Sequence, residues 1–401
     1  MKTKKEILKE LYPEDVFHYS DKLTQEEAEV LYETRQIIEK ELRPVINENW
    51  DKATFPFDAF YKLKDAGIMN NPKLFKNRKN AQKPSEIYNF FLYLELARFD
   101  ASVATFYTVH GGLGYNTILV GGNERQINEF GPKIQNFDYQ TCFALTEPSH
   151  GSDIAGGLET SAKRDGDNWI LNGKKRWIGG ADTADIIPVF ARDEGDGKIK
   201  CFIVRKGAEG YKATPTTQKV SLRAIANSDI EIDEVVIPEA DRLENINGFK
   251  DVNEILIRTR ADVAHIATGI AAGAFVAALK YVNEREQFGQ KLAGFQITQE
   301  KLARLQANVV STMGFSVRLA EMMEEGEFKM VNSALSKMHN ALRMRESVAL
   351  AREICGGNGI TLDTDVSRFF ADAEAIYTYE GTHEINALLV GRELTGIGAY
   401  I

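Results

Sequence analysis

The sequence has few cysteines, and they form no pattern that would bind a metal ion or build a disulfide framework. The three cysteines among 401 residues are Cys142, Cys201 and Cys355, which are widely spaced and include no C-x-x-C pair. This usage argues against a disulfide-stabilised secreted domain and favours a reducing cytoplasm. We expect no metal centre.

The sequence also lacks an excess of positive charge and a long apolar run. Lys and Arg number 49 against 58 Asp and Glu, a net charge of −9, so attraction to a phosphate backbone cannot supply nucleic-acid affinity. The first residues interleave charges with single leucines, unlike a signal peptide. The longest apolar stretch, residues 264–279, is interrupted by polar residues and is shorter than the about 20 residues needed to cross a bilayer. We therefore expect no nucleic-acid partner and no membrane span, with residues 264–279 forming a buried helix.

Proline is absent after Pro238, whereas glycine is concentrated in the middle of the chain. A proline inside a helix costs about 3 kcal/mol, so the chain after Pro238 is free to form long helices. Its apolar residues recur mostly three to four positions apart. Residues 151–210 hold 11 of the 32 glycines between segments of alternating polarity, which is typical of strands and turns. In the first block, Thr24 and Ser85 are expected to begin helices.

The order of these blocks predicts an α+β protein. We expect a helical domain over residues 1–138, a β domain over 139–245 and a bundle of four or five helices over 246–401. Strands do not alternate with helices, and no G-x-G-x-x-G follows a predicted strand. A Rossmann site for a nicotinamide cofactor is therefore not supported.

Two motifs in the predicted β domain carry residues suited to binding a flat, charged cofactor. Residues 142–153 (CFALTEPSHGSD) end a predicted strand in a loop that can offer backbone N–H groups and hydroxyls to a ring or a phosphate. Residues 173–180 (GKKRWIGG) place Trp177 among glycines that permit close approach of a flat group. Taken alone, the first motif could be a plain turn and Trp177 a core residue.

Three further motifs lie in the predicted C-terminal bundle. Residues 285–289 (REQFG), with Gln296, place Arg285 between two helices, where it could clamp an anion or simply end a helix. Residues 353–359 (EICGGNG) form a glycine-rich helix exit. Residues 379–384 (YEGTHE) place Glu380 just before a helix that Thr382 would cap, although a lone glutamate there is more often simply solvated.

In this order the five motifs resemble the acyl-CoA dehydrogenase family, and the resemblance runs over essentially the whole chain to residues 391–397. It implies the acyl-CoA dehydrogenase fold, with FAD between the β domain and the C-terminal bundle, in a tetramer or dimer. It also implies that Glu380 removes the α-proton of an acyl-CoA while hydride passes to the flavin, giving a trans-2-enoyl-CoA in fatty-acid β-oxidation. Electrons would then pass to an electron-transferring flavoprotein.

The resemblance also assigns the contacts of cofactor and substrate, several of them from a neighbouring subunit. The FAD contacts would be Phe143, Leu145, Thr146, Gly151, Ser152, Trp177, Ile178, Gly179, Arg285, Phe288, Gln296, Glu353, Gly356, Gly357, Thr382 and Glu384. Acyl-CoA would lie near Ser152, Arg260 and Gly381.

Some positions depart from the commonest family pattern. Gly179 stands where many relatives carry a hydroxyl residue, which leaves an acyl-CoA oxidase using dioxygen as an alternative. Glu353 and Glu384 stand where straight-chain enzymes often carry glutamine. Together with residues 379–383 (YEGTH) and 394–396 (LTG), they make the chain resemble the branch of glutaryl-CoA dehydrogenases and plant short-chain acyl-CoA oxidases. A non-catalytic acyl-CoA-binding homologue is a further alternative, but it would not need Glu380 or Trp177.

Position 104 bears on the acyl chain. Glutaryl-CoA dehydrogenases carry an arginine that pairs with the distal carboxylate, and an ungapped alignment from Arg98 places Ala104 there. A carboxylate buried against Ala104 without a partner would cost at least several kcal/mol. We therefore expect short to medium saturated acyl chains rather than glutaryl-CoA, with Lys62, Lys64 and Arg98 as basic residues that could still reach the site.

Overall fold

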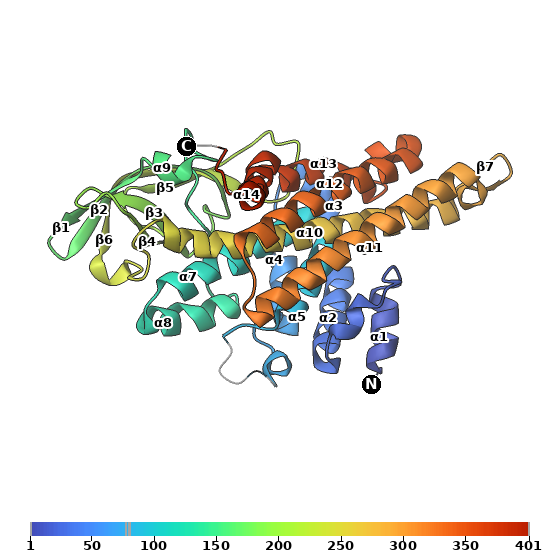
Figure 1. Cartoon of the computed structure of the whole chain (residues 1–401), viewed down its shortest axis with the longest axis horizontal. Helices are drawn as coiled ribbons and strands as arrows, with labels where there is room; N and C mark the ends of the chain where they lie inside the picture. The colour runs from blue at the N-terminus through green and yellow to red at the C-terminus, as the bar shows by residue number, and fades with distance from the viewer. Residues whose placement is uncertain (1, 77, 79–81, 400–401) are drawn as a thin grey trace.

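The computed structural model describes residues 2–76, 78 and 82–399. A helical block, a β-rich block and a second helical block follow one another along the chain (Figure 1). The first block contains α1 (Lys4–Leu11), α2 (Gln25–Ile37), α3 (Ile46–Lys52), α4 (Phe57–Phe60), α5 (Glu86–Phe99), α6 (Ala101–Tyr107), the π-helical segment η5 (Thr108–Tyr115), α7 (Asn116–Gly121) and α8 (Glu124–Gln135).

The later blocks contain the sheet and the long helices. The β-rich block has α9 (Ile154–Gly157), β1 (Ser161–Asp165), β2 (Asn168–Gly179), β3 (Ile186–Asp193), β4 (Ile199–Arg205), β5 (Tyr211–Pro215) and β6 (Asn227–Pro238). The last block has α10 (Phe249–Glu284), the hairpin β7 (Glu286–Gln287) and β8 (Gln290–Lys291), α11 (Gln296–Glu325), α12 (Met330–Ile354), the 3-10 segment η8 (Gly356–Ile360), α13 (Val366–Thr378) and α14 (His383–Thr395).

Local capping signals begin the helices where the sequence predicts. The Thr24 hydroxyl accepts a hydrogen bond from the Glu27 backbone N–H, while the Glu27 carboxylate accepts one from the Thr24 backbone N–H. The Ser85 hydroxyl caps α5 by accepting a hydrogen bond from the Tyr88 backbone N–H, without a reciprocal bond. Both predicted helix starts are confirmed.

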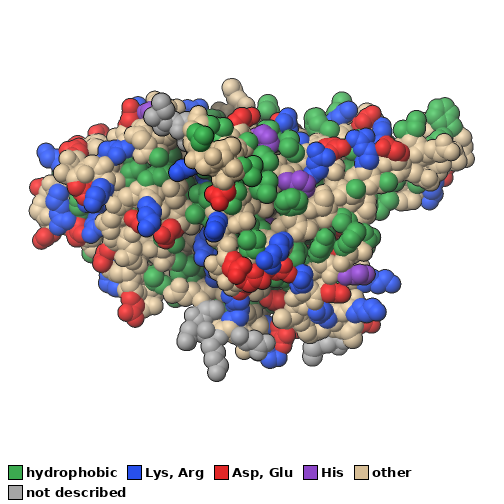
Figure 2. All heavy atoms as spheres, viewed as in Figure 1, with side chains coloured by type: hydrophobic (Ala, Val, Ile, Leu, Met, Phe, Trp, Pro, Cys, Tyr) green, Lys and Arg blue, Asp and Glu red, His purple; other side chains and the backbone are tan. Residues whose placement is uncertain are grey.

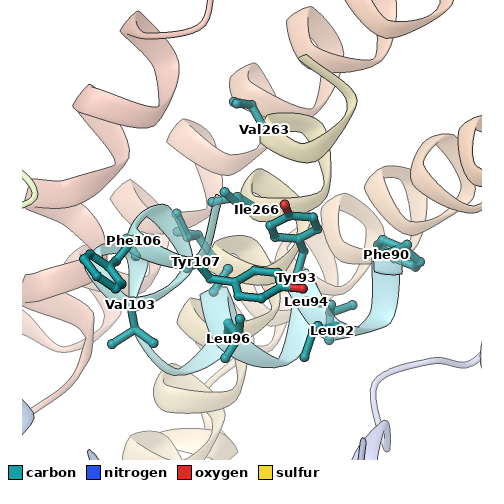
Figure 3. Close-up of a cluster of buried hydrophobic side chains, with 14 of the residues drawn as sticks. Phe90, Leu92, Tyr93, Leu94, Leu96, Val103, Phe106, Tyr107, Val263 and Ile266 are labelled. Carbon is teal, nitrogen blue, oxygen red and sulfur yellow. The ribbon is translucent and has the colours of Figure 1, made fainter. Parts of the chain in front are cut away.

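Helix α5 is buried on nearly all sides, because it lies between α6 and the long helix α10. Figure 3 shows the hydrocarbon side chains of these three helices packed together, with the rings of Tyr93 and Tyr107 among them. Asp100 begins α6 by accepting the N–H groups of Ser102 and Val103, and it also pairs with the buried Arg368 of α13. The two helical blocks therefore share one core.

The sheet has the strand order β4-β3-β1-β2-β6-β5. Its neighbouring strands are antiparallel except for β1 and β3, which run parallel. The pairing of β2 with β6 shifts register between Lys175 and Ile178, where Trp177 has a left-handed backbone with φ of +65°. Such a bulge changes the direction in which a side chain points. This bulge lies within residues 173–180, the glycine-flanked motif around Trp177.

The predicted buried helix over residues 264–279 is confirmed within α10. By length and hydropathy α10 could span a membrane, but 83% of its most apolar window is buried inside the protein. Helices α11, α12 and α13 pack around it, and the absence of proline after Pro238 agrees with their length.

Candidate active site

The two motifs of the β-rich block lie side by side. The Thr146 carbonyl accepts a hydrogen bond from the Arg176 N–H at 2.9 Å. The Lys175 ammonium donates to the Leu145 carbonyl at 3.0 Å and to the Glu147 carboxylate at 2.8 Å. Burial lowers the pKa of Lys175 to about 8, against the opposing effect of Glu147. These contacts fix the loop that carries Thr146 to the strand that carries Trp177.

The expected strand at the start of residues 142–153 is reduced to isolated bridges. Thr141 pairs with Ile186 and Ala144 with Val189 of β3, after which the chain leaves the sheet. Phe143 and Leu145 are buried beneath the loop, whereas Gly151 and Ser152 are exposed at its tip. The loop therefore offers backbone and small hydroxyls to the surface, as the sequence predicts.

Trp177 is not a core residue. Its side chain is 51% exposed, and the guanidinium of Arg176 lies 4.6 Å from the ring centroid. Ile178 and Gly179 follow it as buried residues at the end of β2. A large exposed aromatic ring beside a turn-rich loop can pack against another flat ring, so these residues fit the isoalloxazine of FAD.

Glu380 lies in the turn between α13 and α14, with a left-handed backbone of φ +56°. Its carboxylate accepts a hydrogen bond from the Thr259 hydroxyl of α10 at 2.8 Å. Burial raises the pKa of the Glu380 carboxyl, while the Thr259 hydrogen bond and the charges of Arg260 and Lys337 oppose that rise. The glutamate is therefore held by α10 rather than freely solvated, and a raised pKa suits a general base.

The residues after Glu380 complete this turn. Gly381 also has a left-handed backbone, with φ of +83°, and a Cβ there would lie 3.5 Å from Arg260 Nε. The Thr382 hydroxyl accepts the Ile385 N–H and caps α14, which confirms the predicted helix start. Glu384 is exposed in the first turn of that helix.

The segment α6–η5 lies between the β motifs and the turn that carries Glu380. The Thr105 hydroxyl lies 3.3 Å from the Tyr379 hydroxyl, one residue before Glu380. One turn further on, Val109 Cγ2 lies 3.0 Å from where a Cβ on Gly179 would stand. The C-terminal end of β2 and the turn that carries Glu380 therefore both lie against the segment α6–η5.

The remaining sequence-predicted cofactor residues lie elsewhere, at the hairpin end of the long helices (Figure 1). Arg285 and Gln296 are exposed there, and Phe288 is 95% exposed with a left-handed backbone. Glu353 forms an ion pair with Lys301 of α11 at 2.9 Å, next to Gly356 and Gly357 in η8. Figure 2 shows hydrophobic side chains gathered at this tip. Within one chain the structure does not bring this group to Trp177, because Trp177 is near the end of β2 in the β-rich block, whereas the hairpin β7–β8 lies at the far end of the long helices (Figure 1).

Three functional candidates were not predicted from the sequence: Thr259, Asp262 and Lys337. All three are buried on long helices, and their roles depend on partners distant in the chain. Burial and the nearby Glu86 raise the pKa of Asp262 to about 7, against a hydrogen bond from Tyr93. No local pattern marks them, because Thr259 stands between two arginines and Lys337 follows Ser336 in a mixed polar stretch.

Family models match the chain in three consecutive segments. The N-terminal, middle and C-terminal domains of acyl-CoA dehydrogenase match residues 24–138, 142–235 and 247–395. A probable acyl-CoA dehydrogenase, fadE25 of Mycobacterium bovis, is 32% identical over 379 residues, which cover 93% of this chain and 96% of the relative.

Solved structures show the same likeness. A glutaryl-CoA dehydrogenase from Mycobacterium smegmatis in complex with FADH2 matches with a TM-score of 0.90 and 30% identity, covering 97% of this chain and 99% of its own. Butyryl-CoA dehydrogenase from Megasphaera elsdenii matches with a TM-score of 0.86 and 28% identity, covering 93% and 98%. The predicted α+β fold is confirmed by these matches. The protein belongs to the acyl-CoA dehydrogenase family, whose members are FAD-dependent oxidoreductases acting on the CH–CH bond of an acyl-CoA.

Proposed function

We propose that the protein converts short to medium saturated acyl-CoA thioesters to trans-2-enoyl-CoA in fatty-acid β-oxidation, with Glu380 as the base. The observation that carries this proposal is the placement of Glu380. The backbone of Glu380 is left-handed, and its carboxylate accepts a hydrogen bond from the Thr259 hydroxyl. Burial raises the pKa of this carboxyl, which favours acceptance of a proton.

The chemistry requires a base and a stabilised carbonyl oxygen, because the α-proton of a thioester is weakly acidic. Glu380 takes the proton, and we assign its backbone N–H as a donor to the thioester oxygen. Arg260 and Gly381, beside the base, and Ser152, at the loop tip, are the residues we assign to acyl-CoA.

Bound FAD would supply the acceptor for the hydride that leaves the β-carbon. Trp177 would pack on its ring, with the backbone of residues 143–152 and Gly179 beside it. Arg285 would offset the charge of the diphosphate, and Phe288, Gln296, Glu353, Gly356 and Gly357 would surround the rest of the dinucleotide. These last residues lie at the hairpin end of the long helices, away from the β-rich block that carries Trp177. We therefore propose a homo-oligomer, expected to be a tetramer, in which a second copy of the chain supplies them to the site.

We further propose an electron-transferring flavoprotein as the acceptor and the cytoplasm as the location. The buried free thiols of Cys142, Cys201 and Cys355 support a reducing compartment.

The base assignment is tested with Glu380→Gln. This variant should retain its flavin and bind acyl-CoA, while anaerobic bleaching of the flavin by butyryl-CoA slows by about 10² to 10⁴. Glu374→Gln, which changes an exposed carboxylate on α13, is the matched control and should bleach at the normal rate. Near wild-type bleaching in Glu380→Gln would refute the assignment.

Two other activities each have one observation in their favour. Gly179 offers no side-chain hydroxyl, which favours reaction with dioxygen, as in an acyl-CoA oxidase. The likeness to a glutaryl-CoA dehydrogenase favours glutaryl-CoA as substrate, whereas the buried Ala104 opposes it.

A further inference from the structure

Lys337 of α12 binds the turn that carries Glu380. Its side chain is 1% exposed, and its ammonium group donates to the backbone carbonyls of Tyr377 at 3.2 Å, Tyr379 at 2.6 Å and Gly381. These carbonyls lie on both sides of Glu380. One buried side chain from a different helix therefore holds the chain before and after the base.

The number of donors matches the number of acceptors. An ammonium group has three N–H donors, whereas a neutral amine has two, so the protonated form satisfies all three carbonyls. The Asn386 side-chain amide also donates to the Gly381 carbonyl at 2.8 Å and to the Thr382 backbone carbonyl at 2.9 Å.

This turn needs such support. Glu380 and Gly381 have consecutive left-handed backbones, and a non-glycine residue in that region persists where the surroundings fix it. The Thr259 hydroxyl holds the carboxylate of Glu380 but not its backbone. Lys337 holds the backbone, so the two contacts are complementary.

We propose that Lys337 is a positioning residue for the catalytic base: it fixes the backbone of the Glu380 turn through three carbonyls and places a positive charge beside that turn. The proposal rests on the proposed role of Glu380. A misplacement of about 1 Å at a reacting group can cost about 100-fold in rate, so loss of the three bonds should slow proton removal.

The charges around Lys337 come from three elements. Burial lowers the pKa of Lys337 to about 7, Glu380 and Glu384 favour its charged form, and Arg260 of α10 disfavours it. In turn, the Lys337 charge lowers the pKa of Glu380. Removing that charge should therefore raise the pH at which Glu380 becomes an active base.

The experiment measures the pH dependence of anaerobic flavin reduction by butyryl-CoA in the flavin-loaded enzyme. Lys337→Met removes the donors and the charge, Lys337→Arg keeps the charge with a different geometry, and Lys280→Met changes an exposed lysine of α10 as the control. Lys337→Met should be slower by about 10- to 100-fold, with its acid limb at higher pH. Lys337→Arg should also reduce the flavin more slowly, but the acid limb of its pH profile should stay at the wild-type pH.

A second readout does not depend on catalysis. Hydrogen–deuterium exchange of the amides in residues 377–386 should accelerate in Lys337→Met and not in Lys280→Met. If Lys337→Met does not fold, Lys337→Gln, which keeps two N–H donors without the charge, takes its place with the same expected result.

The outcomes separate this proposal from the one on which it rests. A wild-type protein that no acyl-CoA bleaches would refute the proposed function, whereas bleaching of the wild type with an unchanged rate and pH limb in the Lys337 variants would overturn the role of Lys337. A uniform loss of rate in Lys337→Met, without movement of the acid limb, would overturn the electrostatic part and leave Lys337 with a structural role alone.

Discussion

The ammonium group of Lys175 lies 2.8 Å from the Glu147 carboxylate, and neither side chain reaches solvent. Glu147 also accepts the backbone N–H groups of Glu159 and Thr160, so this one carboxylate ties together both ends of the loop that carries Ser152. The ion pair thereby links the loop to β2, two residues before Trp177.

Lys175→Met is therefore expected to destabilise the protein. Removing one partner of a buried ion pair leaves the other charge uncompensated and costs about 3 to 5 kcal/mol. Thermal unfolding should show a lowered midpoint, together with weaker flavin retention. Lys174→Met, on the exposed neighbouring position of the same strand, is the control and should change stability by less than about 0.5 kcal/mol. Equal midpoints for the two variants would contradict the role given to the pair.

Thr259→Val tests the electrostatics of the base. In its proposed role Glu380 acts as a carboxylate, so the rate of flavin reduction should rise with pH through its pKa, which burial raises. The Thr259 hydrogen bond lowers that pKa, so its loss should move the rising limb to higher pH and leave the plateau rate nearly unchanged. Thr395→Val, at the exposed end of α14, should leave the limb in place. An unchanged rising limb in Thr259→Val would show that the Thr259 hydroxyl does not influence the pKa of Glu380.

Local features of the fold could be predicted from the sequence, whereas the contacts that tune the site could not. Thr24, Ser85 and Thr382 begin helices because a cap depends on residues within one turn. The pairing of Lys175 with Glu147 spans 28 positions and that of Thr259 with Glu380 spans 121. No periodicity in one sequence encodes such separations, since they depend on how the elements pack.

The motifs around Trp177 and Glu380 were found because several short patterns occur in a fixed order. Their left-handed backbones were not predicted, because neither residue is a glycine and such conformations are uncommon for other residues. The strand expected at the start of residues 142–153 is only partly formed: Ala144 makes an isolated bridge to Val189 of β3, and the buried Phe143 and Leu145 belong to no strand.

Arg285→Ala should release flavin, and so should Trp177→Ala, although one chain places Arg285 beside the hairpin β7–β8 and Trp177 near the end of β2 in the β-rich block. If each site combines Trp177 of one copy with Arg285 of another, a mixed dimer of the two variants contains one intact site and one doubly defective site. Co-expressing the two variants and purifying the mixed form by two different tags should then recover flavin at about half occupancy. Mixed oligomers without flavin would contradict the shared site, and full flavin in Arg285→Ala after dialysis would contradict the anion clamp.

Gly179→Ser tests whether the missing hydroxyl affects reaction with dioxygen. A Cβ at this position would lie 3.0 Å from Val109 Cγ2, so Val109 must yield by a few tenths of an ångström, and Gly179→Ala serves as the control for that crowding. In Gly179→Ser, anaerobic reduction should stay close to that of Gly179→Ala, while reoxidation in air should be slower. Identical reoxidation rates in the two variants would remove the argument for an oxidase.

The surroundings of Ala104 are expected to favour an uncharged acyl chain. Ala104 is fully buried on α6, next to Thr105, which contacts Tyr379. Arg98, one of the basic residues that could have reached a distal carboxylate, is instead bonded to Glu14 and the Leu11 carbonyl.

The other charges do not favour a second carboxylate either. Lys62 and Lys64 are exposed at the surface. The buried Asp262 interacts electrostatically with Glu380, so a second acidic side chain already lies near Glu380. Burying a substrate carboxylate without a partner would cost at least several kcal/mol, which is enough to abolish useful binding. In one dye-reduction assay, butyryl-CoA and octanoyl-CoA should therefore both react faster than glutaryl-CoA. Fastest turnover of glutaryl-CoA, with release of carbon dioxide and crotonyl-CoA, would show that another group in the pocket supplies the missing cation.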